Sequence, residues 1–414
     1  MEKKINRSKH RRDKLLNGVI KNFFTPSETE KFNKRLLSGN KTPFKIKLSK
    51  STSLKAKEIN KQSEIDLLIT FAQKTFEKPK YLEFLQQLGQ YCVTTGNNNQ
   101  AQFMLENVVN ETKGKSCFEK IYADAALALG EMHSRQALWK LCVKYIKMAS
   151  AAYKKINDIK GYANSENLLG TTYLEQSKTY MAIKHFEKGL SLLNSSDCDM
   201  IAKIENNIAI TYLIPGNYDS ALMHFNKALY NADKAGDLKQ GTNIHLNLGI
   251  LYTDLDLPEK AFVELDKGIN FGKKINLKLG IANGYALKAY LFIKQKDFSL
   301  AESLTDEALE ISNKINSKVG IADAYKLKGI IQRNFRNYPL AEYYFLTSIR
   351  ICKGLKNEWN GSEAEYELGV LYLEKGQLVE SKKHFLKALK YYKRIKAKKQ
   401  IDEIERYLKN IFVF

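Results

Sequence analysis

The sequence is poor in residues that interrupt helices. It has 6 prolines and 23 glycines among 414 residues. A fold of many short strands needs turn residues more often, so this scarcity disfavours an all-β protein and indicates long helices. No apolar run reaches the roughly 18 residues that a transmembrane helix needs, so we expect none.

Cysteine is also scarce, and its five copies are scattered. No Cys-x-x-Cys pair exists, which argues against both a zinc site and a disulfide framework. The charged start, Met1 to Arg7, precedes no apolar segment, so we expect no secretory signal and a cytoplasmic location. There the cysteines are expected to act as small apolar residues; they are Cys92, Cys117, Cys142, Cys198 and Cys352.

Motifs that carry catalysis are missing as well. The sequence has no Gly-rich phosphate loop, no Gly-x-Ser-x-Gly and no His-Glu-x-x-His. We therefore expect a protein that is not an enzyme and that needs no cofactor and no metal.

Acidic residues are outnumbered, 45 against 67 lysines and arginines, which gives a net charge of +22. With 44% hydrophobic and 27% charged residues, the composition is that of a folded chain. Residues 1–60 hold 17 of the basic residues against 5 acidic ones. This surplus is typical of a segment that meets an anionic partner such as nucleic acid, a membrane surface or an acidic protein.

One repeat dominates the sequence. In its third copy, Leu169-Gly170 and Tyr173 share one helix face, and Ala182 and Phe186 share a face of the next helix. The small residue that corresponds to Ala182 recurs every 39 to 41 residues, at Ala101, Cys142, Ala182, Ala221, Ala261, Ala301, Ala341 and Ser381. Each copy is expected to form a helical hairpin with Phe186, Phe225 and Phe385 in the core. One hairpin cannot bury both of its faces, so the copies must stack on one another.

These residues resemble the tetratricopeptide repeat (TPR), over residues 80–395. The resemblance implies an all-α protein, a right-handed α-solenoid of about eight TPR hairpins with helical caps. The period exceeds the usual length of about 34 residues, and Lys-Ile-Asn-x-x-x-Gly replaces the proline that usually ends a repeat. This long variety resembles the repeats of kinesin light chain, of spindle-orientation adaptors and of Gram-positive peptide-pheromone receptors. Four positions depart from the pattern, so their copies are expected to be looser: Cys92, His133, Lys288 and Lys328.

The expected organisation has four parts. Residues 1–60 form a basic arm with short amphipathic helices, 61–80 a capping helix, 81–395 eight repeats, and 396–414 a C-terminal capping helix. In the arm, Ser27 and Glu30 suit a capping box, residues 39–55 a linker, and a helix is expected from Ser63 to Phe76. An apolar stripe between Leu15 and Phe24 is too regular for an inert tail, so we expect it to dock on the repeats or on a partner.

In TPR proteins the first helix of each hairpin lines the concave groove. Asparagine carries a donor and an acceptor, so a row of them can pair with an extended peptide backbone. In the other interpretation Asn207 and Asn247 bond neighbouring helices, or the asparagines are only polar surface. The expected groove residues are Asn164, Asn167, Lys203, Asn206, Asn243, Asn283, Tyr290, Lys326 and Arg333.

Three histidines recur at one repeat position, His185, His224 and His384. They lie on different hairpins, whose helix axes are about 8–10 Å apart or more, whereas a shared metal needs ligands within about 2 Å. We therefore expect solvated histidines on the convex face rather than a metal site.

Three functions fit these observations. The first is a scaffold or adaptor that binds a protein or peptide partner in the groove. The second is a peptide-responsive regulatory receptor, although residues 1–80 show no clear DNA-binding or effector domain. The third is a nucleic-acid-associated protein that acts through the basic arm, with sequence-specific DNA binding disfavoured because no helix-turn-helix is recognisable. The oligomeric state stays open.

Overall fold

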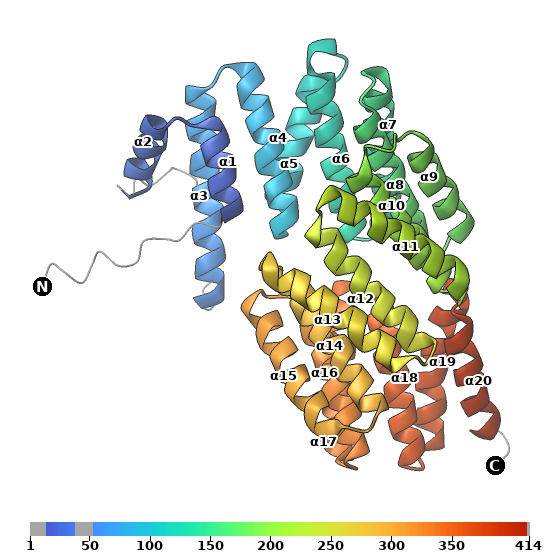
Figure 1. Ribbon diagram of the computed structural model, residues 1–414. Coiled ribbons are helices and arrows are strands. Elements are labelled where there is room, and N and C mark those ends of the chain that lie inside the picture. Colours follow the sequence, from blue (N-terminus) through green and yellow to red (C-terminus); the bar gives the residue numbers. More distant parts are fainter. Residues whose placement is uncertain (1–13, 38–52, 412–414) are drawn as a thin grey trace, which may run out of the picture. The chain divides into compact units, whose positions relative to one another are not determined.

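All regular structure in the described part of the chain is helical. The computed structural model describes residues 14–37 and 53–411 (Figure 1). The chain divides into two compact units, residues 1–165 and 166–414. Unit 1 contains α1 (Lys14–Phe23), α2 (Pro26–Leu37), α3 (Ser53–Thr75), α4 (Lys78–Thr95), α5 (Asn98–Thr112), the 3-10 turn η1 (Ser116–Phe118), α6 (Glu119–Arg135) and α7 (Trp139–Lys155).

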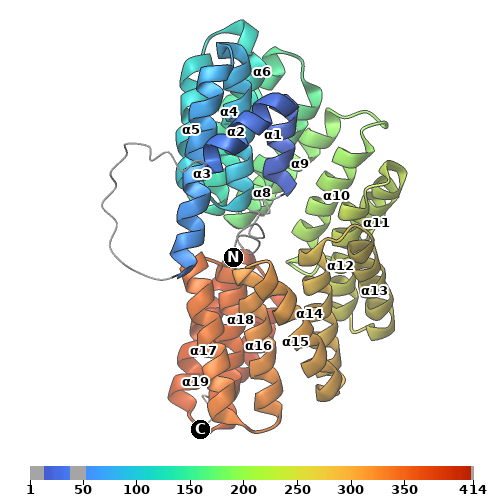
Figure 2. The ribbon, with the colours of Figure 1, turned by 90° about the vertical axis from the view of Figure 1, so that its left-hand side faces the viewer.

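Helix α8 (Ile159–Glu175) begins in unit 1 and ends in unit 2. Within unit 2 the antiparallel helices follow one another side by side (Figures 1 and 2). They are α9 (Thr179–Ser191), α10 (Cys198–Leu213), α11 (Tyr218–Ala235), α12 (Leu238–Asp254), α13 (Pro258–Lys274), α14 (Lys278–Lys294), α15 (Phe298–Lys314), α16 (Lys318–Asn334), α17 (Tyr338–Leu355), α18 (Glu358–Glu374), α19 (Leu378–Ile395) and α20 (Lys398–Ile411).

The helices from α4 to α19 pair as consecutive hairpins, which confirms the TPR-like solenoid. The eight small residues that define the period, from Ala101 to Ser381, are all fully buried. Phe186, Phe225 and Phe385 are fully buried too, as expected. A Cβ atom on Gly369 would lie 2.8 Å from Cδ1 of Phe385, so glycine is what lets the two helices of that hairpin approach.

The Lys-Ile-Asn-x-x-x-Gly segments explain how one hairpin ends and the next begins. Asn276 has φ 54° and Asn316 φ 55°, a left-handed conformation that asparagine tolerates and that ends a helix. The following residue closes the turn, as where Ser317 N donates to the Ser312 carbonyl at 2.8 Å. A Cβ atom on Gly320 would clash with the Ser312 side chain. The motif thus combines a helix stop with a close helix-to-helix approach.

The apolar stripe of the arm docks on the first helices of unit 1. Phe23 meets Phe84 edge-to-face at 5.4 Å between ring centroids, and Phe24 lies 4.7 Å from Phe76. Phe32, on α2, lies 5.7 Å from Phe71 and is 2% exposed. Of the two expectations for the stripe, docking on the repeats is the one that the structure shows.

Two sequence expectations for the arm were wrong. The capping box is formed by Thr25 and Glu28: Thr25 N donates to Glu28 Oε2 at 2.8 Å and Glu28 N to Thr25 Oγ1 at 3.3 Å. Glu30 instead pairs with Lys34. Helix α3 starts at Ser53, ten residues before the expected Ser63, because residues 53–62 are rich in good helix formers. Much of the linker expected at 39–55 lies outside the described residues.

The C-terminal cap continues the repeat. A capping helix was expected over residues 396–414, and α20 begins at Lys398; residues 412–414 lie outside the described part. Ile404 is fully buried and Leu408 is 7% exposed. Leu408 stands 40 residues after Leu368, so α20 is the first helix of a ninth, incomplete repeat.

Candidate functional site

The first helices of the hairpins in unit 2 form one continuous surface, called the inner face here. It is made by α10, α12, α14, α16 and α18, each of which contacts the next. Among the expected groove residues, Lys203, Asn243 and Asn283 occupy one position at 40-residue intervals, and Asn206 and Lys326 share another position three repeats apart. The structure separates them into three groups by burial and partners.

The first group holds neighbouring repeats together. Asn207 donates its side-chain amide to Asn167 Oδ1 at 2.8 Å, and Asn247 donates to Asn206 Oδ1 at 2.9 Å. Asn167 is 3% exposed and Asn206 is 8% exposed. These two hydrogen bonds agree with the alternative interpretation of the sequence, in which Asn207 and Asn247 bond neighbouring helices. Little surface of Asn167 and Asn206 is left to meet a ligand.

The second group is open to solvent. Asn243 on α12 and Asn283 on α14 occupy one register position in successive repeats, and both are exposed. Tyr290, two turns further along α14, is 40% exposed. Asn164 and Lys203, which hold the same position in earlier repeats, are half-buried and make other contacts.

The third group consists of cations that carboxylates already neutralise. Lys326 pairs with Glu363 and, at 3.1 Å, with Asp323; its side chain is 14% exposed. Loss of hydration lowers the pKa of Lys326, but the two carboxylates outweigh it and leave the pKa well above its usual range. Arg333 binds Glu367 Oε2 at 2.5 Å. Neither cation is available to bind an anion unless an internal ion pair breaks.

Acidic side chains surround this part of the inner face. Burial raises the pKa of Glu363, and Asp323 adds to that rise while Lys326 opposes it. Tyr290 is 40% exposed as a whole, but loss of hydration at its phenol raises the pKa of that group. The nearby charges of Glu367 and Glu363 raise this pKa further. This part of the inner face thus presents carboxylates that are paired with its two cations, together with the phenol of Tyr290.

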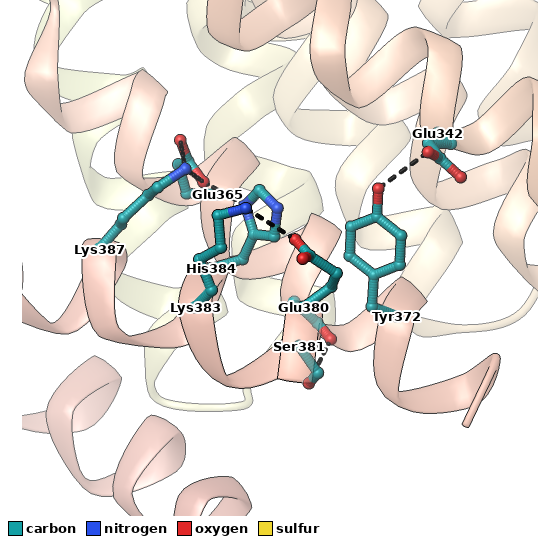
Figure 3. Close-up of polar contacts among 9 residues, drawn as sticks. Glu342, Glu365, Tyr372, Glu380, Ser381, Lys383, His384 and Lys387 are labelled. Atoms are coloured by element: carbon teal, nitrogen blue, oxygen red, sulfur yellow. Dashed lines mark hydrogen bonds and ion pairs between the residues drawn. The ribbon is translucent and has the colours of Figure 1, made fainter. Parts of the chain in front are cut away.

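The histidines do not lie on a solvated surface, so that expectation was wrong. His185, His224 and His384 each bond through Nδ1 to a glutamate of the same hairpin, at 2.7, 2.5 and 2.5 Å. The ring of His384 also stacks on Tyr372 at 5.4 Å (Figure 3). The glutamates stand 19 residues earlier, and the fifth repeat reverses the order with His245 before Glu264; the partners are Glu166, Glu205 and Glu365.

Sequence reasoning missed these glutamates although a signal existed. A spacing of 19 residues between Glu and His recurs three times, and once with the two residues exchanged. A pair that survives exchange indicates mutual contact rather than two solvated side chains. Lysine takes part as well, as where Lys188 binds the other oxygen of Glu166 at 2.8 Å (Figure 3 shows the equivalent Lys387 beside Glu365).

Two of the four departures from the repeat pattern, Lys288 and Lys328, are explained by ion pairs. Lys288 binds Asp266 at 2.7 Å and Lys328 binds Asp306 at 2.5 Å, in each case an aspartate on the preceding second helix. Both lysine side chains are less than one-fifth exposed. An ion pair therefore stands where other copies place leucine.

Within the described residues, no group of three or more His, Cys, Asp or Glu side chains is arranged to hold a metal ion. No described helix combines the length and the apolar character that crossing a membrane requires. Four cysteines, Cys92, Cys142, Cys198 and Cys352, are buried, and Cys117 is exposed.

The hairpin geometry defines a TPR-type solenoid, and known structures agree. No protein-family model matches the sequence, and no curated protein matches it either. A Rap conjugation gene regulator of the plasmid pLS20, in complex with a peptide, is similar with a TM-score of 0.59, 15% identity and coverage of 92% of this chain and 96% of that chain.

Two further structures resemble the chain over most of both lengths. A Rap protein complexed with Competence and Sporulation Factor has a TM-score of 0.57 and 12% identity, with 93% of this chain and 98% of that chain covered. The apo quorum sensor NprR from B. thuringiensis has a TM-score of 0.57 and 15% identity, with 88% and 97% covered. At these identities the likeness shows the fold alone.

Proposed function

We propose that the chain is a non-enzymatic scaffold whose inner face binds an extended segment or a helix of a protein partner. The observation that carries this proposal is the second group of groove residues. Asn243 and Asn283 offer exposed amides one repeat apart, and Tyr290 offers a partly exposed aromatic ring two turns further along α14. Amides suit a peptide backbone, and tyrosine is a frequent anchor in interfaces.

The chemistry favours a segment with hydrogen-bonding and cationic groups. The carboxylates near Tyr290 are those of Glu363 and Glu367. Glu363 pairs with Lys326, and Glu367 pairs with Arg333. A partner that brings an amine or guanidinium gains charge-assisted hydrogen bonds there, whereas an acidic partner meets repulsion.

A second candidate is a peptide-responsive receptor. Structures of a Rap protein with Competence and Sporulation Factor and of a Rap regulator with a peptide share this fold over more than nine-tenths of the chain. An adaptor keeps its conformation when it binds the segment, whereas a receptor changes its conformation on binding. A third, nucleic-acid binding through residues 1–60, predicts affinity that falls steeply with salt, whereas groove binding falls little.

The test is a selection of random-sequence peptides on the full chain, followed by titration of the recovered peptides. We expect Tyr290→Ala and Asn283→Ala to weaken binding by about 1–3 kcal/mol each, since the partner's polar groups lose their pairing. Tyr180→Ala is the matched control, because Tyr180 is 78% exposed on the second helix α9. Recovery of no peptide, or equal loss in Tyr180→Ala and Tyr290→Ala, rejects the inner face as the site.

A further inference from the structure

The two ends of unit 2 meet in what is called the closing contact here. Lys399 at the start of α20 binds Asp254 at the end of α12, with Nζ at 2.9 Å from Oδ1 and 3.1 Å from the carbonyl oxygen. Ile214, at the end of α10, packs with Trp359 and Tyr391 around the core of α18–α20. The paired residues are 145 or more positions apart, whereas other contacts of unit 2 join neighbouring repeats.

This closing contact is loosely packed. A cavity of about 190 Å³ remains between its sides, lined by Leu174, Thr211 and Ile214 and by Trp359, Tyr391 and Ile395. Open space between the two sides reduces the packing energy gained by closure. The Lys399–Asp254 pair is partly exposed, which weakens it further.

Trp359 connects the closing contact to the inner face. It stands one turn before Glu363 on α18. Glu363 pairs with Lys326, which also holds Asp323. Asn360, the residue after Trp359, donates to Asp323 at 2.8 Å. The first turn of α18 therefore lines the cavity through Trp359 and bonds through Asn360 to the Lys326 cluster, defined as Asp323, Lys326 and Glu363.

We propose that the closing contact is a latch for the inner face, and that Trp359 couples the state of this latch to occupation of the Lys326 cluster. The inference rests on the proposed function for its ligand. A cationic group that pairs with Glu363 competes with Lys326 for this carboxylate and loosens the cluster that holds α16 to the first turn of α18. Since Trp359 stands in that turn and packs in the closing contact, loosening the cluster favours the open form. By linkage, opening the latch changes ligand affinity by the same factor.

The first experiment needs no ligand. Trp139→Phe leaves Trp359 as the sole tryptophan of the full chain, so acrylamide quenching reports exposure of Trp359 alone. Lys399→Ala removes the ion pair of the closing contact, and we expect the quenching constant to rise about twofold as the open form gains population. Lys326→Met removes the cation of the inner-face cluster, and we expect a rise of the same kind. Far-ultraviolet circular dichroism checks that each variant is folded.

A matched control exists on the same helix end. Lys294 pairs with Asp256 at 3.1 Å, two residues from Asp254 but outside the closing contact. Lys294→Ala should leave the quenching of Trp359 unchanged. If Lys326→Met does not fold, Asp323→Asn perturbs the same cluster more mildly. A rise in Lys399→Ala with none in the cluster variants overturns the coupling, and no rise in either overturns the latch.

A second experiment tests peptide binding and the latch together, with outcomes that distinguish failure of one from failure of the other. A peptide recovered on the inner face should change the quenching of Trp359 in the Trp139→Phe protein, and Lys399→Ala should alter its Kd by about fivefold or more. Lys294→Ala should leave that Kd unchanged. Failure to recover a peptide rejects the proposed function while the ligand-free measurement still decides the latch. A bound peptide that changes neither quantity overturns the latch while the proposed function stands.

Discussion

At the scale of single residues, polar pairs specify the register of the hairpins. The Glu–His pairs join the two helices of one hairpin, and the Asn–Asn pairs join the first helices of successive hairpins. Apolar side chains alone permit small sliding of one helix on another, whereas a buried hydrogen bond with a fixed partner does not. The Glu–His and Asn–Asn pairs therefore help to fix how neighbouring helices align along their axes.

The asparagine ladder leads to a stability prediction. Asn206→Ala leaves the Asn247 amide without its acceptor in a site that is nearly closed to solvent, so we expect a loss of about 1–3 kcal/mol in unfolding free energy. Asn243→Ala, at an exposed position four residues before Asn247, should cost less than about 0.5 kcal/mol. Denaturant titration of both variants measures the difference. Equal midpoints for the two variants would contradict the structural role of Asn206.

The glutamate–histidine pairs predict a loss of stability in acid. Burial raises the pKa of Glu166 and of Glu365, but the hydrogen bonds of His185 and His384, assisted by lysines, outweigh burial and leave both pKa values lowered. A carboxyl with a lowered pKa in the folded state adds stability above its unfolded pKa of about 4.3 and loses it as pH falls through the folded value.

The measurement is the melting temperature between pH 7 and pH 3. We expect Glu365→Gln to melt lower than wild type at pH 7 and to lose less on acidification, since the variant has no carboxylate to protonate there. Glu187→Gln, on the exposed side of α9, should follow the wild-type curve. Parallel curves for Glu365→Gln and wild type would show that this pair does not contribute.

The residue scale is also where sequence reasoning reached its limit. The small residue of each repeat and Phe225 could be placed in the core, because spacing and size alone specify them. Lys326 and Arg333 were expected to line the groove, and the sequence did not show that Glu363 and Glu367 neutralise them. Partners in the next repeat depend on the rotation between hairpins, which no local pattern encodes.

At the scale of elements, the hairpin is the unit that the sequence specifies best. Eight hairpins were expected and the helices from α4 to α19 form them. Helix ends were less certain: α3 begins ten residues early and the cap of α2 uses Thr25 rather than Ser27. Several residues within one turn can serve as a helix cap, so the sequence does not specify the end residue. The 40-residue period, in contrast, is repeated in eight copies and is therefore specified many times.

One substitution tests the hairpin core. Phe225→Ala should lower the unfolding free energy by about 3–5 kcal/mol, since Phe225 is fully buried between α10 and α11 and its removal leaves a cavity. Met223→Ala, two residues before on the same helix, is the control because Met223 is 48% exposed. Hydrogen exchange locates the loss, which should be largest in α10–α12. A Phe225→Ala protein with wild-type protection there would refute the assignment.

At the scale of the molecule, the closing contact sets unit 2 apart from an open solenoid. In an open stack each repeat interacts with its neighbours alone, so stability is nearly a sum of local terms. Here Lys399 and Trp359 meet residues of α10 and α12 that precede them by more than 140 positions. The first and last repeats of unit 2 therefore share part of their stability.

Removal of the last helix tests this long-range sharing. A chain that ends at Ile395 lacks α20 and with it the Lys399–Asp254 pair. We expect faster hydrogen exchange not only in α18 and α19, which lose their cap, but also at the ends of α10 and α12. In the full chain, Ile401→Ala is the milder comparison, since Ile401 packs on the core of α18–α20. Changes confined to α18 and α19 would show that the two ends are independent.

The end-to-end contact also restricts how such a chain can evolve. Repeat proteins commonly lengthen or shorten by tandem duplication or deletion of whole repeats. One extra hairpin between α12 and α18 would displace Trp359 and Tyr391 from Ile214 by about the 8–10 Å that separates packed helices. The geometry of the closing contact therefore constrains the number of repeats between α12 and α18, whatever the sequence of each repeat. Insertions in this lineage should accumulate in turns between hairpins, and family members with a different copy number here should lack the aromatic pair.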